Sequence, residues 1–235
     1  MSNKLKLYFY ITFVFCIMKL PIIKQLKNRN QIEVAKLQDE LILLLYNIDN
    51  TLIIHGGTAL WRCYSGHRFS EDIDLYSLIF PGRLNDVKNE ILSHELKLLK
   101  LKDTGNILFS NISDGIVNVK IEINHKYYPQ KPVEMEYELI DGNSVNVLTL
   151  SPEDLIKEKI LAYNDRRFIR DLYDIYILIK YINHPECIRE NLIKFLNEIQ
   201  KPVDENVLKS IVYLGLPPSY NRMFDYIEQY INSTR

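Results

Sequence analysis

Apolar positions spaced three and four residues apart mark the first part of the chain. From Ile22 to Tyr46 this spacing predicts one long amphipathic helix, carried by Val34, Leu37, Leu41, Leu44 and Leu45. Turn-forming residues then end the helix, at Asn47, Asp49 and Asn50. The short apolar run Leu52-Ile53-Ile54 predicts a buried strand that stops at Gly56-Gly57.

The segment after these glycines predicts a helix and a second strand. The helix is expected from Thr58 to Tyr64 and the strand between Phe69 and Ser77. Side chains alternate along a strand, so residues two apart share a face. One face takes Ile73 and Leu75, and the other takes Asp72, Asp74 and Tyr76.

A helix and several strands are predicted next. The helix is expected from Pro81 to Leu96, and strands near Leu98 to Lys102, Ile107 to Ile112, Val117 to Asn124, Val133 to Ile140 and Val145 to Leu148. The clearest alternation in the chain is that of Val117 to Asn124, with a polar face of Asn118, Lys120, Glu122 and Asn124.

At Ser151-Pro152-Glu153-Asp154 the pattern becomes helical. Ser151 suits a helix N-cap and Pro152 the first helical position. Helical spacing then continues to Tyr230, with pauses at His184-Pro185, Lys201-Pro202 and Pro217-Pro218. We therefore predict an α+β fold, with an N-terminal extension (1–19), a mixed-sheet domain with flanking helices (20–150) and a helical domain (151–235).

The apolar run at the N-terminus has several interpretations. Leu5 to Met18 is apolar and starts beside Lys4 and Lys6, like a secretory signal, but no small-residue cleavage site follows. The run is too short to span a bilayer as a helix. We expect either translation from Met18 or a disordered or peripherally packed segment, with secretion a third alternative. A cytoplasmic protein without stable membrane association is expected.

Composition narrows the kinds of partner. The 235 residues are 47% hydrophobic and 25% charged, with a formal net charge of -1, so any nucleic-acid contact needs a local basic patch. The three cysteines, Cys16, Cys63 and Cys187, form no paired motif, which argues against a disulfide framework or a zinc site.

The Gly56-Gly57-Thr58 turn is a candidate phosphate site. A strand that ends in two glycines and opens a helix presents free backbone N–H groups at the positive end of the helix dipole. Thr58 adds a hydroxyl donor. The alternative is a tight turn that needs only the conformational freedom of glycine.

Two acids follow this turn at a suitable spacing. Asp72 and Asp74 would point to the same face of their strand, where Mg²⁺ could hold both carboxylates and a triphosphate. Glu122, on the polar face of the strand with the clearest alternation, is the candidate third metal ligand. The alternatives are a solvated edge strand for the two aspartates and an exposed Glu–Lys face for Glu122.

These residues carry a family resemblance. The strings GGTAL and RFSEDIDL resemble the AbiEii/AbiGii-type toxins of toxin–antitoxin systems, in the DNA polymerase β-like nucleotidyltransferase superfamily. Gly56, Gly57 and Thr58 match the turn, and Arg68, Ser70, Asp72 and Asp74 match the second motif. EKILA, with Lys159, and RDLYD, with Asp171, match later helical motifs. The resemblance runs from about Ile53 to Leu178, and Glu122 matches it least well.

The helical motifs also have a physical interpretation. Lys159 could reach a triphosphate as a mobile point charge. A purely structural alternative pairs Arg170 with Asp174 and Arg167 with Asp171, each four residues apart on one helix. A basic cluster with interleaved aromatic residues could contact RNA, although a solvated helix surface is the more common meaning: Lys157, Lys159, Arg166, Arg167 and Arg170, with Tyr163, Phe168 and Tyr173.

The sequence therefore predicts a Mg²⁺-dependent nucleotidyltransferase that moves NMP from an NTP to an acceptor hydroxyl. Asp72, Asp74, Lys159 and Asp171 are the candidate catalytic residues. Gly56, Gly57, Thr58, Arg68 and Ser70 would bind the nucleotide. The resemblance implies an RNA acceptor, such as the 3′ end of tRNA, and a cognate antitoxin. The alternatives are kinase-like phosphoryl transfer from the same site and a binding module of this fold without catalysis.

Overall fold

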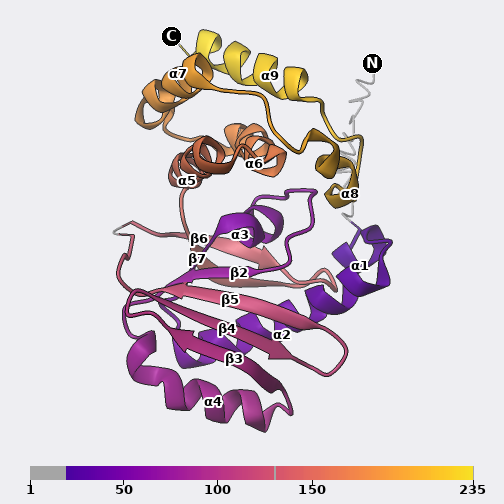
Figure 1. Cartoon of the computed structure of the whole chain (residues 1–235), viewed down its shortest axis with the longest axis vertical. Coiled ribbons are helices and arrows are strands. Elements are labelled where there is room, and N and C mark those ends of the chain that lie inside the picture. Colours follow the sequence, from indigo (N-terminus) through magenta and orange to yellow (C-terminus); the bar gives the residue numbers. More distant parts are fainter. Residues whose placement is uncertain (1–19, 130, 235) are drawn as a thin grey trace, which may run out of the picture.

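A seven-stranded mixed sheet lies at the centre of the structure, a computed structural model that describes residues 20–129 and 131–234 (Figure 1). The spatial order is β3-β4-β5-β2-β1-β7-β6. The strands are β1 (Ile53–His55), β2 (Ile73–Tyr76), β3 (Lys97–Asp103), β4 (Ile107–Ser113), β5 (Asn118–Asn124), β6 (Val133–Glu138) and β7 (Ser144–Thr149). Two pairs, β2–β5 and β1–β7, are parallel and the other pairs are antiparallel. The sheet and the helices around it confirm the predicted α+β class.

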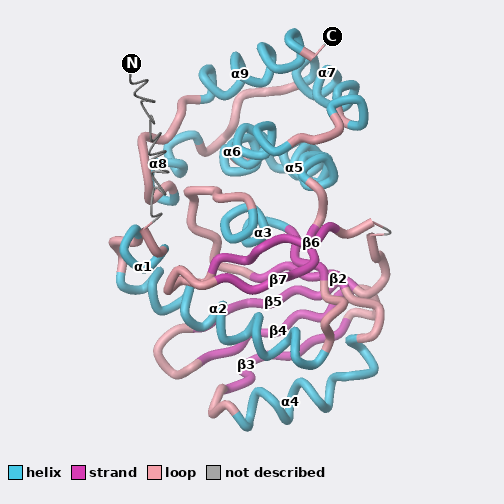
Figure 2. Tube along the Cα trace, turned by 180° about the vertical axis from the view of Figure 1, so that it is seen from behind, coloured by secondary structure: helices cyan, strands magenta, loops and turns pink. Residues whose placement is uncertain are grey.

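Helices cover the sheet unequally. They are α1 (Ile22–Gln25), α2 (Arg29–Ile48), α3 (Gly56–Cys63), α4 (Leu84–Ser93), α5 (Pro152–Arg166), α6 (Ile169–Leu178), α7 (Arg189–Glu198), α8 (Leu208–Ile211) and α9 (Tyr220–Ser233). Helices α2 and α4 pack on one face, seen in front of the strands in Figure 2. Helix α3 packs on β1, β2 and β6, and α5 to α9 form a further layer beyond it (Figure 1).

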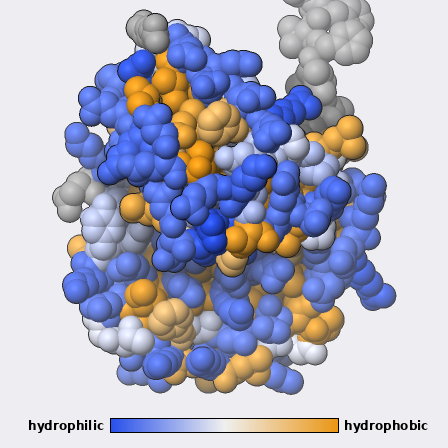
Figure 3. All heavy atoms as spheres, turned by 45° about the horizontal axis from the view of Figure 1, so that its top comes forward, coloured by the Kyte–Doolittle hydropathy of each residue, from blue (hydrophilic) through white to orange (hydrophobic). Residues whose placement is uncertain are grey.

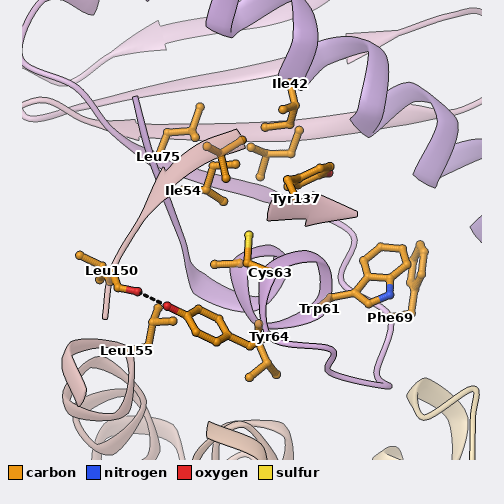
Figure 4. Close-up of a cluster of buried hydrophobic side chains, with 14 of the residues drawn as sticks. Ile42, Ile54, Trp61, Cys63, Tyr64, Phe69, Leu75, Tyr137, Leu150 and Leu155 are labelled. Atoms are coloured by element: carbon orange, nitrogen blue, oxygen red, sulfur yellow. Dashed lines mark hydrogen bonds between the residues drawn. The ribbon is translucent and has the colours of Figure 1, made fainter. Parts of the chain in front are cut away.

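The core is continuous from the sheet into this helical layer. Helix α3 lies between the sheet and α5, as Figure 4 shows. Trp61 packs edge-on against Phe69, with ring centroids 4.9 Å apart. The Tyr64 hydroxyl donates a hydrogen bond of 2.7 Å to the carbonyl of Leu150, just before α5 begins. The division into domains at residues 150 and 151 therefore stays a prediction, because buried side chains pack across it.

Local sequence signals explain where helices start and stop. Ser151 caps α5, since its side chain accepts from the Asp154 N–H at 3.2 Å, as predicted. The predicted helix from Ile22 is interrupted, because Asn28 caps α2 with a side-chain bond of 2.9 Å to the Asn30 N–H. Arg167 ends α5 in a left-handed conformation, φ 53°, a break that periodicity did not predict.

The remaining helical differences are small. A 3-10 turn at Phe80–Arg83 precedes α4, which ends at Ser93, three residues before the predicted end. Similar turns lie at Ile179–Tyr181, Pro185–Cys187 and Glu205–Val207. The apolar run from Leu5 to Met18 lies outside the described residues. Among the residues that are described, no helix is long and apolar enough to cross a membrane. The face shown in Figure 3 is largely hydrophilic, with scattered apolar side chains.

Candidate active site

The Gly56-Gly57 turn lies directly against the predicted acids. Gly56 has φ +68°, a left-handed conformation that favours glycine. A Cβ atom on Gly56 would collide with the Asp74 carboxylate. A Cβ atom on Gly57 would lie 2.5 Å from Ser70 Oγ and 2.6 Å from Arg68 Nη2. The two glycines therefore let the backbone at the start of α3 approach the side chains of the second motif.

Three carboxylates meet on neighbouring strands. In the sheet, Asp74 is opposite His55 on one side and opposite Glu122 on the other. Asp72 lies two residues before Asp74, just outside β2. The sequence predicted Glu122 as the third acid of this set, and the parallel pairing of β2 with β5 places it opposite Asp74.

The charges of these acids act on one another. Burial raises the pKa of Asp72, and the charge of Asp74 raises it further, while Lys120 and Arg170 oppose the rise. Burial also raises the pKa of Glu122, followed by the charges of Asp74 and Asp72. Clustered carboxylates that disfavour ionisation are the environment that a bound cation relieves.

The donor set of this cluster fits Mg²⁺. Carboxylate oxygens are the ligands that this ion prefers, and it usually takes one or two of them together with water and substrate phosphates. Within residues 20–129 and 131–234, no group of three or more His, Cys, Asp or Glu side chains is arranged so that it could hold a metal ion by itself. An incomplete protein cage is compatible with a metal that shares its coordination with a nucleotide.

Thr58 contacts the backbone of Asp72. Its hydroxyl donates a hydrogen bond of 2.5 Å to the backbone carbonyl of Asp72, and the residue is fully buried. This contact fixes the position of Asp72 relative to α3. It uses the hydroxyl that the sequence assigned to a phosphate, and the fully buried Thr58 has no exposed surface for a nucleotide to contact.

A buried ion-pair network lies beside the turn. Asp174, on α6, receives two hydrogen bonds from Arg68, at 2.5 and 2.6 Å, and pairs with Lys159 at 2.8 Å. Burial alone would raise the pKa of Asp174, but the charges of Arg68 and Lys159 outweigh it and lower the pKa. Asp174 thus joins the loop before β2 to both α5 and α6.

Asp171 has its own partner. Arg166 donates two hydrogen bonds of 2.8 Å to its carboxylate, while Lys159 is more distant, at 3.9 Å. The suggested pairs Arg170–Asp174 and Arg167–Asp171 are wrong, since both carboxylates turn inward to partners outside that i, i+4 spacing. Asp171 is fully buried, and the Lys159 side chain is only 8% exposed.

Arg170 has the opposite character. It is exposed, its guanidinium lies 5.5 Å from the Phe168 ring centroid, and its charge lowers the pKa of Asp72. The sequence placed Arg170 in a basic cluster without linking it to the aspartates. Its proximity to Asp72 arises from tertiary packing of α6.

A second polar contact connects β1, β2 and α5. The His55 ring stacks on Tyr76 with centroids 3.9 Å apart, and His55 Nδ1 lies 3.2 Å from Glu158 Oε2. The Tyr76 hydroxyl donates to the other oxygen of Glu158. Burial opposes ionisation of Glu158, but the hydrogen bond from His55 and its charge lower the pKa. Sequence reasoning included Glu158 in the EKILA match but assigned it no role.

Cavities flank the carboxylates at both ends of β2. One, of about 390 Å³, is mainly polar and is bordered by Asp72, Lys120 and the amides Asn28, Asn30, Gln31 and Asn118. The other, of about 530 Å³, is bordered by Tyr76, Tyr127, Leu161, Lys157 and Lys131. We refer to them as the amide cavity and the aromatic cavity.

This arrangement agrees with the comparison to protein families. The model of the nucleotidyl transferase AbiEii toxin of type IV toxin–antitoxin systems matches residues 43–224. The chain belongs to the AbiEii family. The match covers the turn, the carboxylates and both helical motifs, and it confirms the family resemblance. This AbiEii-family chain is a nucleotidyltransferase of the toxin class.

Solved structures share its fold. JHP933 from Helicobacter pylori is 20% identical, with a TM-score of 0.61, and the alignment covers 88% of this chain and 92% of that one. MenT4, a nucleotidyltransferase toxin from Mycobacterium tuberculosis, is 19% identical, with a TM-score of 0.56, covering 86% and 82%. No curated protein matches this AbiEii-family sequence.

The predicted site residues of this AbiEii protein thus fall into two groups. The turn and the carboxylates lie together at the end of β1: Gly56, Gly57, Ser70, Asp72, Asp74 and Glu122. Arg68, Lys159 and Asp171 lie beside them but are buried and paired with protein groups.

Proposed function

We propose that the protein transfers a nucleoside monophosphate from an NTP to the 3′ hydroxyl of an RNA, with tRNA as the acceptor. The observation that carries this proposal is the placement of Asp74 opposite Glu122 and against the glycine turn. Asp72, Asp74 and Glu122 would hold Mg²⁺, which when bound supplies Lewis acidity at the reacting phosphate. The reaction would take place in the cytoplasm, where NTPs and tRNA are found.

The donor nucleotide would lie along β2. Its triphosphate would lie against the start of α3, at Gly56 and Gly57, where the helix dipole favours anions. Arg170 is exposed, and its positive charge acts on Asp72. The aromatic cavity suits the flat base, because Tyr127 is 59% exposed and offers its ring for stacking. The amide cavity then remains for the acceptor.

In the reaction, the acceptor hydroxyl oxygen forms a bond to the α-phosphorus. The bond from that phosphorus to the bridging oxygen breaks, pyrophosphate leaves and the hydroxyl proton passes to solvent. Arg170 counters charge on the departing phosphates. Arg68 and Lys159 act through Asp174, which fixes the Gly57 side of the site to α6.

Asp74→Asn tests the proposal directly. It keeps the shape of the side chain and removes a metal-binding charge, so transfer should fall on the order of a thousandfold. The measurement is incorporation of label from α-labelled NTP into total tRNA, with and without EDTA and added Mg²⁺. The matched control is Asp225→Asn on α9, an exposed aspartate with no described partner, which should transfer at the wild-type rate.

The position of the label separates the alternatives. If RNA is labelled only from γ-labelled NTP, the reaction is kinase-like phosphoryl transfer at the same carboxylates and not nucleotidyl transfer. Equal labelling by wild type and Asp74→Asn would remove the catalytic assignment. A cognate antitoxin protein, expected for this toxin class, should restore growth of cells that express the wild-type chain.

A further inference from the structure

Three cross-strand rows run over the uncovered face of β3, β4 and β5. The paired registers give the rows Lys97–Ser113–Asn118, Lys100–Asn111–Lys120 and Lys102–Phe109–Glu122. Paired residues point to the same side of a sheet, and Asn118 confirms this by donating to Asn111 at 2.9 Å within the face. Each row therefore ends in a lysine on the edge strand β3. We call this surface the lysine face.

The lysine face is open. The helices that pack against these strands are α2 and α4, and both lie on the opposite side, as Figures 1 and 2 show. Lys97, Lys100, Lys102 and Lys120 are all exposed. No described acid forms an ion pair with any of these four lysines. The one acid in the three rows is Glu122, and it belongs to the carboxylate cluster.

The lysine face leads to the active site. Its third row ends at Glu122, which is opposite Asp74 on β2. Its inner residues Asn118 and Lys120 also border the amide cavity, together with Asp72. A chain that lies across the lysines of β3 therefore reaches the catalytic carboxylates through a polar cavity without crossing a helix.

We propose that the lysine face binds the phosphodiester backbone of the acceptor RNA near its single-stranded 3′ end and guides that end into the amide cavity. This inference rests on the proposed function, because it names where the acceptor of that reaction binds. Lys100 and Lys102 are about 7 Å apart along β3, and Lys97 lies beyond a register shift on the same strand, so an extended polyanion can contact several lysines. Phe109, half-buried between Lys102 and Glu122, offers a ring edge to a base.

Charge complementarity favours RNA over an acidic protein partner. The lysine face has cations spread over three rows and side-chain amides between them, but few apolar groups that a protein interface would bury. Amides and cations together match the phosphates, sugars and base edges of a nucleic acid.

The test measures RNA binding by the full chain without nucleotide. The triple variant Lys97→Gln, Lys100→Gln, Lys102→Gln removes three charges at exposed positions. Fluorescence anisotropy with a labelled single-stranded RNA of roughly 12 nucleotides reports the affinity at several salt concentrations. We expect the dissociation constant to rise by roughly tenfold or more, and the logarithmic salt slope to fall by about 2.

The matched control removes three exposed charges elsewhere. Lys194, Lys201 and Lys209 lie in the helical layer and have no described ion-pair partner, so their triple Gln variant should bind RNA as the wild type does. Circular dichroism checks that both variants fold. Equal affinities for the two triple variants would overturn the proposal, and so would binding of polyglutamate in place of RNA.

Failure of this inference is distinguishable from failure of the proposed function. Binding is measured without NTP, so loss of RNA binding in the lysine variant supports the lysine face even if no nucleotide is transferred. Transfer to tRNA with unchanged RNA binding in the same variant would leave the function standing and refute the lysine face.

Discussion

Two buried arginine–aspartate pairs show how similar contacts serve different purposes. Arg62 pairs with Asp39 at 3.1 Å, and its guanidinium lies 4.0 Å from the Trp61 ring centroid. It also donates to the backbone carbonyls of Glu138 and Ala35. This pair joins α2, α3 and the end of β6, and none of these contacts involves the carboxylates or the glycine turn.

The second pair, Arg68 with Asp174, differs in geometry and in neighbours. Arg68, which lies beside Gly57, donates two hydrogen bonds to the Asp174 carboxylate. Lys159 adds a second cation. The pKa values move in opposite directions as a result. Burial raises the pKa of Asp39 more than Arg62 lowers it, whereas two cations outweigh burial at Asp174 and lower its pKa.

The difference teaches that burial alone does not determine what a charged pair does. A carboxylate with one cation in the core remains costly to ionise, so the Asp39 pair adds little electrostatic stability. A carboxylate between two cations favours its charged form. Asp174 can therefore fix the loop before β2 relative to α5 and α6. The comparison leads to three predictions.

The largest effect is expected for Asp174→Asn. The amide leaves Arg68 and Lys159 buried without a carboxylate between them, so the free energy of unfolding at neutral pH should fall by roughly 3–5 kcal/mol. Urea unfolding followed by circular dichroism gives this value.

The counterpart variant is Asp39→Asn. Because Asp39 has one cationic partner instead of two and burial raises its pKa, this variant should lose less, only about 1 kcal/mol. An equal loss in the two variants would show that the second cation at Asp174 does not matter to stability.

A smaller effect appears in the pH dependence of stability. The lowered pKa of Asp174 adds stability that is present above the usual aspartate pKa and is lost as pH falls through the lowered value. The raised pKa of Asp39 acts the other way, since its contribution is largest in acid and falls as pH rises through the raised value.

Unfolding free energies of wild type and both asparagine variants, measured from about pH 6 to about pH 3, check these signs. The difference between wild type and Asp174→Asn should shrink toward acid. Toward acid, the free energy of unfolding of the wild type should rise relative to that of Asp39→Asn. Parallel curves would contradict the assignment of opposite pKa shifts.

Periodicity was sufficient for most of the fold. Alternation from Val117 to Asn124 predicted β5 and its polar face, and the glycine pair located the turn between β1 and α3. Both are local signals, because side-chain spacing and glycine content depend only on neighbouring residues. The same spacing placed Asp72 and Asp74 on one face and gave Glu122 as the candidate third acid.

The ion-pair partners of the buried charged residues could not be predicted from neighbouring residues in the sequence. Arg68 and Asp174 are 106 residues apart in the chain, and only the packing of α6 on the loop before β2 unites them. Sequence spacing suggested Arg170 for Asp174, since residues four apart on a helix are neighbours. The left-handed Arg167 was equally hidden, because arginine gives no local signal for that conformation.

The last prediction distinguishes the two arginines by activity. Lysine keeps the charge but cannot make the two-pronged contact of a guanidinium. Arg68→Lys should therefore loosen Asp174 and the Gly57 side of the site, and lower the kcat/KM of nucleotide transfer about tenfold, or about 1.4 kcal/mol. Arg62→Lys should leave the transfer rate of the folded protein within about twofold, because no contact of Arg62 reaches the carboxylates or the turn. The α-labelled NTP assay measures both variants after their folded fractions are matched. Similar losses would mean that the whole buried core, and not the Arg68–Asp174 contact, sets the geometry of the site.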